Sequence, residues 1–161
     1  MKRVGLISDT HGSVHPEVFR LFDGVDLILH AGDVDSATVL SDLEVVAPVL
    51  AVKGNMDADW APASLPALRL IDVEGHRVAV IHNVRHLSAE LIRVGAKLEE
   101  VDVVVYGHTH LAEWHREGPI LYVNPGSARA DAPKASVALL EVTSERVTAR
   151  LVPLAKGAEE G

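Results

Sequence analysis

Five apolar segments of this sequence each run directly into Asp, His or Asn residues, and this pattern constrains the fold more than any other feature. The segments are typical of buried β-strands, because each is short, rich in Val, Ile and Leu and bounded by polar residues. In open α/β sheets, ligands bind at the carboxyl ends of the strands. We therefore expect one polar site, built from the strand-end sequences Ser8-Asp9-Thr10-His11, His30-Ala31-Gly32-Asp33, Lys53-Gly54-Asn55-Met56-Asp57, Ile81-His82-Asn83 and Tyr106-Gly107-His108-Thr109-His110.

Strand and helix patterns alternate in the first two thirds of the chain, and strands dominate the last third. This order predicts an α/β protein with one mixed sheet, or two sheets packed face to face and flanked by helices. Helices are expected from Pro16 to Gly24, from a Ser36 cap to Leu43 and from a Ser88 cap to Lys97. Strands are expected at 3–8, 26–30, 49–53, 68–73, 77–82, 101–106, 120–124, 135–142 and 146–152.

Length and composition exclude several classes of protein. The 161 residues suit one domain, expected over 1–154 with a flexible tail at 155–161. Cysteine is absent, which excludes thiol catalysis and zinc–thiolate sites. The net charge of −8, with scattered Lys and Arg, makes nucleic acid an unfavourable partner. No apolar run approaches the ~20 residues of a membrane span, so we expect no membrane association and a cytoplasmic location.

The polar strand ends carry the residue types of a metal site. Residues two apart on an extended chain point the same way, so Asp9 and His11 would face one ion, and His108 and His110 would both face the site. Each motif alone is a common turn sequence, but their repetition at five strand ends favours a site. Seven oxygen and nitrogen ligands are too many for one tetrahedral ion and suit two ions sharing a carboxylate. The expected ligands are Asp9, His11, Asp33, Asn55, His82, His108 and His110.

These motifs, in this order, resemble those of the calcineurin-like metallophosphoesterases, and more closely the compact bacterial and archaeal phosphodiesterases among them. Asn124-Pro125-Gly126-Ser127 also matches a segment of that branch. The resemblance implies a four-layer α-β-β-α sandwich of two mixed sheets flanked by helices. It further implies one metal held by Asp9, His11, Asp33 and His110, a second held by Asp33, Asn55, His82 and His108, and assembly into dimers or tetramers in some members.

Two positions depart from the motifs of that branch. Met56 stands where many members of the superfamily have a histidine that acts as a general acid or contacts phosphate. His82-Asn83-Val84 replaces the usual His-Gly-His, and Asn83 is expected to keep the turn because Asn tolerates left-handed backbone. Either His86 substitutes for the missing second histidine or no residue does.

The remaining histidines and Asp57 are assigned from their neighbours in the sequence. Asp57 is expected to orient a ligand because it lies two residues after Asn55. His30 is either a satisfied buried histidine or a second such orienting residue. The others, His15, His76 and His115, are expected to face solvent.

The expected function is hydrolysis of a small phosphoester, most of all a phosphodiester. A hydroxide bridging two divalent transition metals would attack phosphorus, and Asn55 would contact the phosphate. The imidazole ligands favour Mn, with Ni, Fe or Zn as alternatives, over Mg or Ca. Two other functions remain open, a protein-interaction scaffold like the retromer subunit of this fold and a nuclease. No Rossmann or P-loop glycine motif occurs, so a nucleotide-binding domain is discarded.

Overall fold

Two five-stranded sheets form the centre of the protein. The computed structural model describes residues 1–58, 60–62 and 65–155. Both sheets are mixed, with three parallel strands at the centre or toward one side and antiparallel strands beside them. The first sheet has the order β10 (Val147–Pro153), β9 (Ser136–Val142), β1 (Lys2–Ile7), β2 (Leu27–His30), β3 (Val49–Ala51), and the second β4 (Leu68–Val73), β5 (His76–Ile81), β6 (Val103–Val105), β8 (Ile120–Asn124), β7 (Glu113–Glu117).

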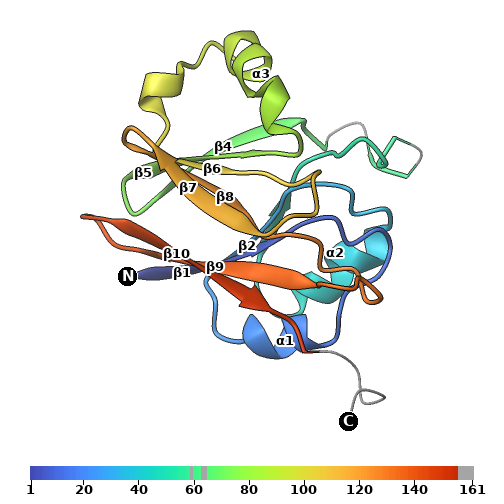
Figure 1. Ribbon diagram of the computed structural model, residues 1–161. Helices are drawn as coiled ribbons and strands as arrows, with labels where there is room; N and C mark the ends of the chain where they lie inside the picture. The colour runs from blue at the N-terminus through green and yellow to red at the C-terminus, as the bar shows by residue number, and fades with distance from the viewer. Residues whose placement is uncertain (59, 63–64, 156–161) are drawn as a thin grey trace.

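Helices cover the outer face of each sheet, which gives four layers (Figure 1). Helices α1 (Glu17–Leu21) and α2 (Ala37–Glu44) pack on the first sheet, and α3 (Leu87–Arg93) packs on the second. Two short 3-10 helices also occur in the part of the chain that the structure describes, η1 (Val84–His86) before α3 and η2 (Leu98–Glu100) after it. The two mixed sheets and the α/β class expected from the sequence are confirmed.

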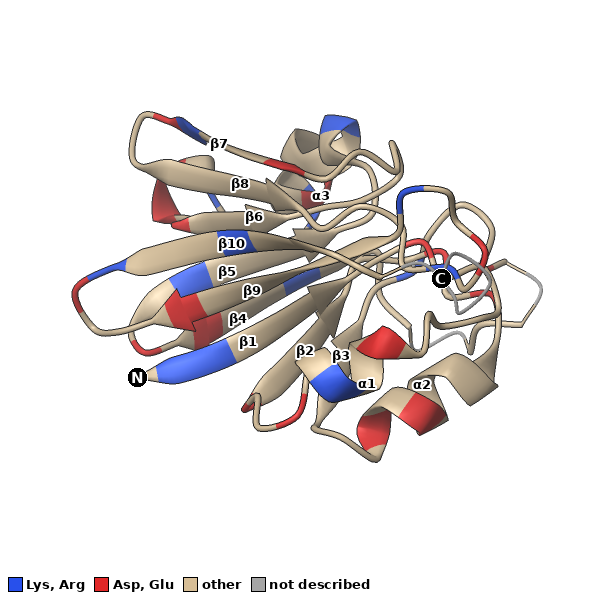
Figure 2. Ribbon diagram, turned by 60° about the horizontal axis from the view of Figure 1, so that its bottom comes forward, with Lys and Arg blue, Asp and Glu red and all other residues tan. Residues whose placement is uncertain are grey.

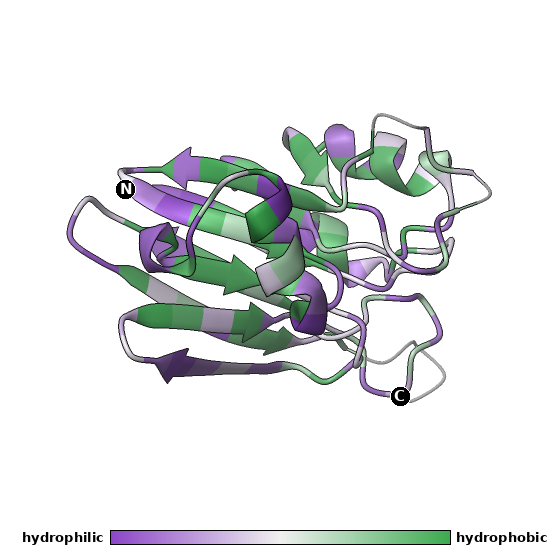
Figure 3. Cartoon of the chain, turned by 90° about the horizontal axis from the view of Figure 1, so that it is seen from above, coloured by the Kyte–Doolittle hydropathy of each residue, from purple (hydrophilic) through white to green (hydrophobic). Residues whose placement is uncertain are grey.

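Alternation along the strands produces the layers. Leu6 and Leu29 point into the core between the sheets, whereas their neighbours Ile7 and Ile28 point outward to α1 and α2. Because successive side chains of a strand face opposite sides, a strand buried on both faces must be apolar throughout. Much of the strand segment area is accordingly green, that is hydrophobic, in Figure 3.

The fold brings the predicted strand ends to one end of the sandwich. Strands β1, β2 and β3 run parallel in the first sheet, and β5, β6 and β8 run parallel in the second. The loops that follow β1 and β6 meet across the two sheets, since the His108 backbone N–H donates to the Asp9 carboxylate at 3.0 Å. The site therefore lies where both parallel sets end.

Several local expectations need correction. The third helix begins at Leu87 and ends at Arg93, because Asn83 accepts the Arg85 N–H and starts η1 first. Strand β7 was not expected, because its sequence Glu-Trp-His-Arg-Glu is exposed on every residue and lacks an apolar face. Ser36, by contrast, caps α2 as predicted, accepting from the Thr38 N–H at 3.2 Å.

A cluster of basic residues would indicate a nucleic-acid partner, and a long apolar helix would indicate a membrane partner. Lys and Arg residues are spread over separate elements, such as β1, β7 and α1 in Figure 2. Within the residues that the structure describes, no helix is long and apolar enough to cross a membrane. The single domain over 1–154 stays a prediction, and the predicted tail lies, beyond Ala155, outside the described residues.

Candidate metal centre

Two groups of acidic and histidine side chains meet at the strand ends. Among the described residues, Asp9, His11 and His110 form one group with potential ligand atoms within 4.8 Å of one another. Asp9, Asp33 and His82 form the other. We call these the outer group and the inner group, because the three inner residues are all buried, whereas His11 is half-buried and His110 exposed. Five of the seven predicted ligands thus lie in the two groups.

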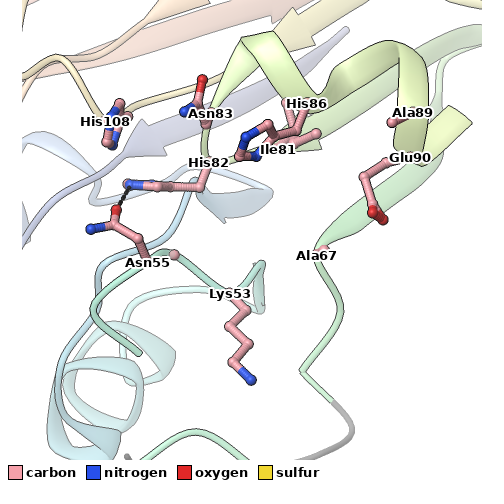
Figure 4. A pocket seen from close by; sticks show the side chains of 11 residues that line it. Lys53, Asn55, Ala67, Ile81, His82, Asn83, His86, Ala89, Glu90 and His108 are labelled. Atoms are coloured by element: carbon pink, nitrogen blue, oxygen red, sulfur yellow. Dashed lines mark hydrogen bonds between the residues drawn. The ribbon is translucent and has the colours of Figure 1, made fainter. Parts of the chain in front are cut away.

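The other two predicted ligands, Asn55 and His108, lie beside the inner group. The Asn55 side-chain oxygen lies 2.9 Å from His82 Nε2 (Figure 4). The His108 ring packs edge-on against the His82 ring, with 5.2 Å between the ring centres. All seven predicted residues are therefore at the site, contributed by loops that follow β1, β2, β3, β5 and β6.

One buried oxygen at the centre of the site lacks a hydrogen-bond partner. Asp9 Oδ2 accepts from the Ser8 hydroxyl at 2.7 Å and from the His108 N–H at 3.0 Å. Asp9 Oδ1 is buried and has no hydrogen-bond partner among the described residues. It faces the Nε2 atoms of His110 at 3.3 Å, His11 at 3.7 Å and His82 at 3.9 Å. An unpartnered buried carboxylate oxygen is costly, and a cation removes that cost.

The protonation of the His82 ring also indicates that a cation belongs at this site. Its Nδ1 lies 2.8 Å from the Ala31 carbonyl oxygen, which can only accept, so Nδ1 carries the proton. The Nε2 atom then faces further acceptors, the Asn55 oxygen at 2.9 Å and Asp33 Oδ2 at 3.2 Å. A neutral imidazole has no proton left for them. Either a second proton or a metal ion must lie between these atoms.

The pKa values reflect this unbalanced charge. Burial alone would lower the pKa of His82, but its contact with Asp33 and the charges of Asp9 and Asp33 outweigh burial and raise the pKa above its usual value. Burial works to raise the pKa of Asp33, yet the contacts from His82 and the Met56 N–H lower it. The Asp33 carboxylate is thus held in a setting that favours a neighbouring positive charge.

The ligand loops are held in a strained backbone conformation. Six of the seven non-glycine residues with positive φ among the described residues lie in these loops: Asp9, His11, Asp33, Asp35, His108 and His110, at φ from 46° to 75°. Left-handed backbone costs non-glycine residues roughly 1–3 kcal/mol each and persists only where the surroundings impose it. We expected an extended backbone at Asp9 and His11, and this was wrong because both residues are left-handed. Both side chains nevertheless reach the site.

Asp57 ties the loops that carry Asp33 and Asn55 to each other. Its buried carboxylate accepts from the Gly54 and Asp33 N–H groups at 2.8 and 2.9 Å, and from the Trp60 indole at 2.7 Å. It also accepts from the N–H groups of the two residues after Asp33. Gly54 allows this close approach, because a Cβ there would collide with the backbone and side chain of Asp33. This geometry agrees with the positioning role expected for Asp57.

His30 lies beneath the inner group and is fully buried. Its Nε2 lies 3.1 Å from the Thr10 hydroxyl, and its Nδ1 accepts from the Gly32 N–H at 3.1 Å. Burial lowers its pKa to about 3, despite the opposing charge of Asp57, so the ring is neutral. His30 thus combines both alternatives left open by the sequence, since it is a satisfied buried histidine that also braces the loop before Asp33.

Three contacts at the site were not expected from the sequence. Asp35 lies 3.6 Å from His11 Nδ1 and places a carboxylate behind that ring. The Ser127 hydroxyl donates to the Asp9 carbonyl oxygen at 2.7 Å. Asn124 donates to Gly107 O and Thr109 Oγ1, which fixes the loop of His108 and His110. The sequence features that could have indicated these contacts are Asp35, the second Asp after Gly32, and the Asn-Pro-Gly-Ser segment, which contains Asn124 and Ser127.

Two predictions about residues around the site were wrong. Asn83 has φ −113° and is extended rather than left-handed, because its side chain caps η1. His15 is buried, with 7% of its surface exposed, because the Glu17 N–H donates to its Nδ1 at the start of α1. The exposed position expected for His115 is confirmed, and its ring stacks on Tyr122.

Comparison with known proteins agrees with this site. A calcineurin-like phosphoesterase superfamily domain matches residues 1–145. A probable metallophosphoesterase of Methanothermobacter thermautotrophicus is 38% identical over 160 residues, covering 92% of this chain and 91% of the relative. Phosphodiesterase YfcE of Escherichia coli K12 is 30% identical, covering 79% of each chain. In structure, Vps29 of Chaetomium thermophilum is similar, with a TM-score of 0.77 at 20% identity over 99% of this chain and 89% of that one. The chain belongs to the calcineurin-like phosphoesterase superfamily.

Proposed function

We propose that this protein is a phosphodiesterase that depends on two divalent metal ions. Asp9, His11, Asp33 and His110 would hold one ion, and Asp33, Asn55, His82 and His108 the other. Members of this superfamily bind divalent metals, and several relatives are named phosphodiesterases or probable metallophosphoesterases. The cytoplasmic location and the assembly into dimers or tetramers stay predictions.

The observation that carries this proposal is the unpartnered Asp9 Oδ1 facing three imidazole nitrogens. Oxygen and nitrogen donors converge there, and the His82 ring directs its Nδ1 proton away from them, to the Ala31 carbonyl. Asp33 Oδ2 lies 3.2 Å from His82 Nε2 and 3.8 Å from His11 Nε2, so it borders both groups. This position supports Asp33 as the shared ligand. The imidazole donors favour Mn as the native metal, with Ni, Fe and Zn as alternatives.

The chain's own residues would bind and orient the phosphate. Bound divalent ions supply an activated water nucleophile and neutralise negative charge on the phosphate oxygens. The two carboxylates offset only about half of the formal +4 of two ions, so the site attracts an anion despite the chain's net charge of −8. Asn55, exposed at the entrance, would donate its amide to a phosphate oxygen.

Met56 cannot donate a proton to the departing oxygen. Its side chain is 54% exposed and carries no titratable group. We therefore expect rates to fall steeply as the pKa of the leaving group rises. A series of aryl phosphodiesters with graded phenol pKa values measures this slope, and a flat dependence would show that another group donates the proton.

The proposal is tested by hydrolysis of bis(p-nitrophenyl) phosphate. Metal-stripped protein is titrated separately with Mn, Ni, Zn, Fe and Mg, and compared with an Asp33→Asn variant. We expect metal-dependent turnover in the wild type and a loss of at least about a hundredfold in Asp33→Asn. Asp42→Asn, a matched change on the exposed face of α2, should keep full activity. Turnover that needs no metal, or that survives in Asp33→Asn, would refute the proposal.

A further inference from the structure

A cavity of about 360 Å³ opens beside the inner group. It lies between the loop after β3, the end of β5 and the start of α3 (Figure 4). Its volume is within the range of roughly 300–1,000 Å³ typical of small-molecule sites. A phosphate group held at the ligand side chains would leave most of this space free for whatever is attached to it.

The wall of this cavity changes character with distance from the ligands. Asn55, His82 and His108 line the end nearest the inner group. Beyond them the wall is mixed, because Ala67, Ile81 and Ala89 are apolar whereas Asn83 and His86 are polar. Lys53 and Glu90 also line the cavity and carry opposite charges. The cavity thus has a phosphate end and a wall that offers apolar contacts beside polar ones.

A second, smaller cavity borders the outer group. It has a volume of about 220 Å³ and is lined in part by His110, Ser127 and Arg129. Arg129 is paired with Asp131 at 2.5 Å, so its charge is already compensated. A phosphorus atom placed between the two groups would therefore have one cavity on the side of His82 and another on the side of His110.

We propose that the larger cavity receives one of the two ester groups of a phosphodiester, and that it selects a compact, uncharged organic group with an apolar face. This inference rests on the proposed function and names its substrate class. Paired cavities suit a diester, which carries two organic groups, better than a monoester, which carries one. The apolar part of the wall favours a ring-sized group over a methyl group, because burying apolar surface is favourable.

The test fills the cavity from α3 and measures binding rather than turnover. Ala89→Trp places a large ring at the cavity wall, whereas Ser88→Trp places the same ring on the adjacent exposed position, outside the cavity. Calorimetry on the metal-loaded proteins gives the Kd of diphenylphosphinate and of dimethylphosphinate, two diester analogues whose carbon–phosphorus bonds a phosphodiesterase does not hydrolyse. We expect the wild type and Ser88→Trp to prefer diphenylphosphinate by about tenfold or more, and Ala89→Trp to lose that preference.

The outcomes separate this inference from the proposed function. The inference would be overturned if Ala89→Trp kept the preference, or if both variants lost it. In either case, wild-type hydrolysis of bis(p-nitrophenyl) phosphate would still support the proposed phosphodiesterase activity. A wild type that hydrolyses no phosphoester with any metal would overturn the proposed function and the inference with it. Dimethylphosphinate should bind all three proteins equally, which shows that the proposed ligand residues are undisturbed.

Discussion

The inner and outer groups share Asp9 but differ in their exposure to water. Asp33 and His82 are 3% and 5% exposed, whereas the His110 side chain is 45% exposed. Inside a protein, charges interact more strongly because water screens them less. An unpaired charge is also more costly there. The inner group should therefore hold its ion more tightly and suffer more from the loss of a ligand.

The surroundings of the two groups differ in the same direction. His82 is fixed through Nδ1 by the Ala31 carbonyl, and its Nε2 lies 2.9 Å from the Asn55 oxygen and 3.2 Å from Asp33 Oδ2. His110 approaches Asp9 at 3.3 Å and His11 at 3.4 Å, and its exposed ring has more freedom. A preorganised ligand loses less entropy on binding. We expect two binding steps, with the tighter one at the inner group.

The largest expected effect is a difference in activity between the loss of His82, from the inner group, and the loss of His110, from the outer group. His82→Ala removes a buried ligand and leaves Asp33 without its neighbour, so we expect activity to fall by more than about a hundredfold. His110→Ala should cost about tenfold and recover in part at higher metal concentration. Steady-state rates as a function of metal concentration measure both. Equal losses, or rescue of His82→Ala alone, would break the distinction between the groups.

The next effect concerns Asp57, which supports the inner group without lying in it. Asp57→Asn keeps the size of the side chain but replaces an acceptor with an amide donor that faces backbone N–H groups. Each buried polar atom left without a partner costs roughly 1–3 kcal/mol, so we expect a loss of about 3 kcal/mol in the free energy of unfolding. We also expect metal affinity to fall about 10- to 100-fold at the tighter step.

Denaturant unfolding and calorimetric metal titration check this pair of effects. Asp42→Asn on the surface of α2 serves as the matched control and should change neither quantity. A loss confined to the weaker binding step would show that Asp57 supports the outer group instead.

The smallest effect is a pH dependence that arises from His30. Its pKa is about 3 in the folded protein, because of burial, and 6.5 as the unperturbed value. Between these values the unfolded chain binds a proton that the folded protein does not. The free energy of unfolding therefore falls as pH falls below 6.5, by up to about 1.4 kcal/mol per pH unit for one proton.

His30→Gln removes this contribution and keeps an amide that can bond to Thr10. In metal-free protein between pH 6 and pH 4, stability should fall less steeply in the variant than in the wild type. Denaturant unfolding at several pH values measures the two slopes. Equal slopes for the variant and the wild type would mean that His30 becomes charged in the folded protein at these pH values. The surroundings of the inner group would then be less shielded from water than the structure indicates.

Much of this arrangement could be predicted from the sequence, because polar residues of the same few types follow one parallel strand after another. Apolar runs place the strands, and the polar residues after them have only one end of the sandwich at which to meet. The proximity of Asp9, Asp33 and His82, which we propose as metal ligands, could therefore be predicted without coordinates. The four layers came from resemblance, since the strand patterns alone also permitted a single mixed sheet.

Other features depend on contacts that no local pattern encodes. Strand β7 pairs with β8 although every residue of β7 is exposed, so hydrogen bonding to its neighbour, and not burial, defines it. The left-handed backbone of Asp9 and His11 is imposed by bonds to the loop after β2, from the Asp9 N–H to Gly32 and from the His11 N–H to Asp33. The buried position of His15 likewise depends on a distant contact, because its backbone N–H donates to the carbonyl oxygen of Ala128, which is far away in the sequence.

The most direct test of this account is anomalous diffraction from crystals soaked in Mn. We expect two anomalous peaks, one among Asp9, His11 and His110 and the other among Asp33, Asn55, His82 and His108, with the higher occupancy at the second. A single peak would leave one group without its proposed role. The absence of any peak near Asp9 Oδ1 would contradict the central claim that these side chains form a metal centre.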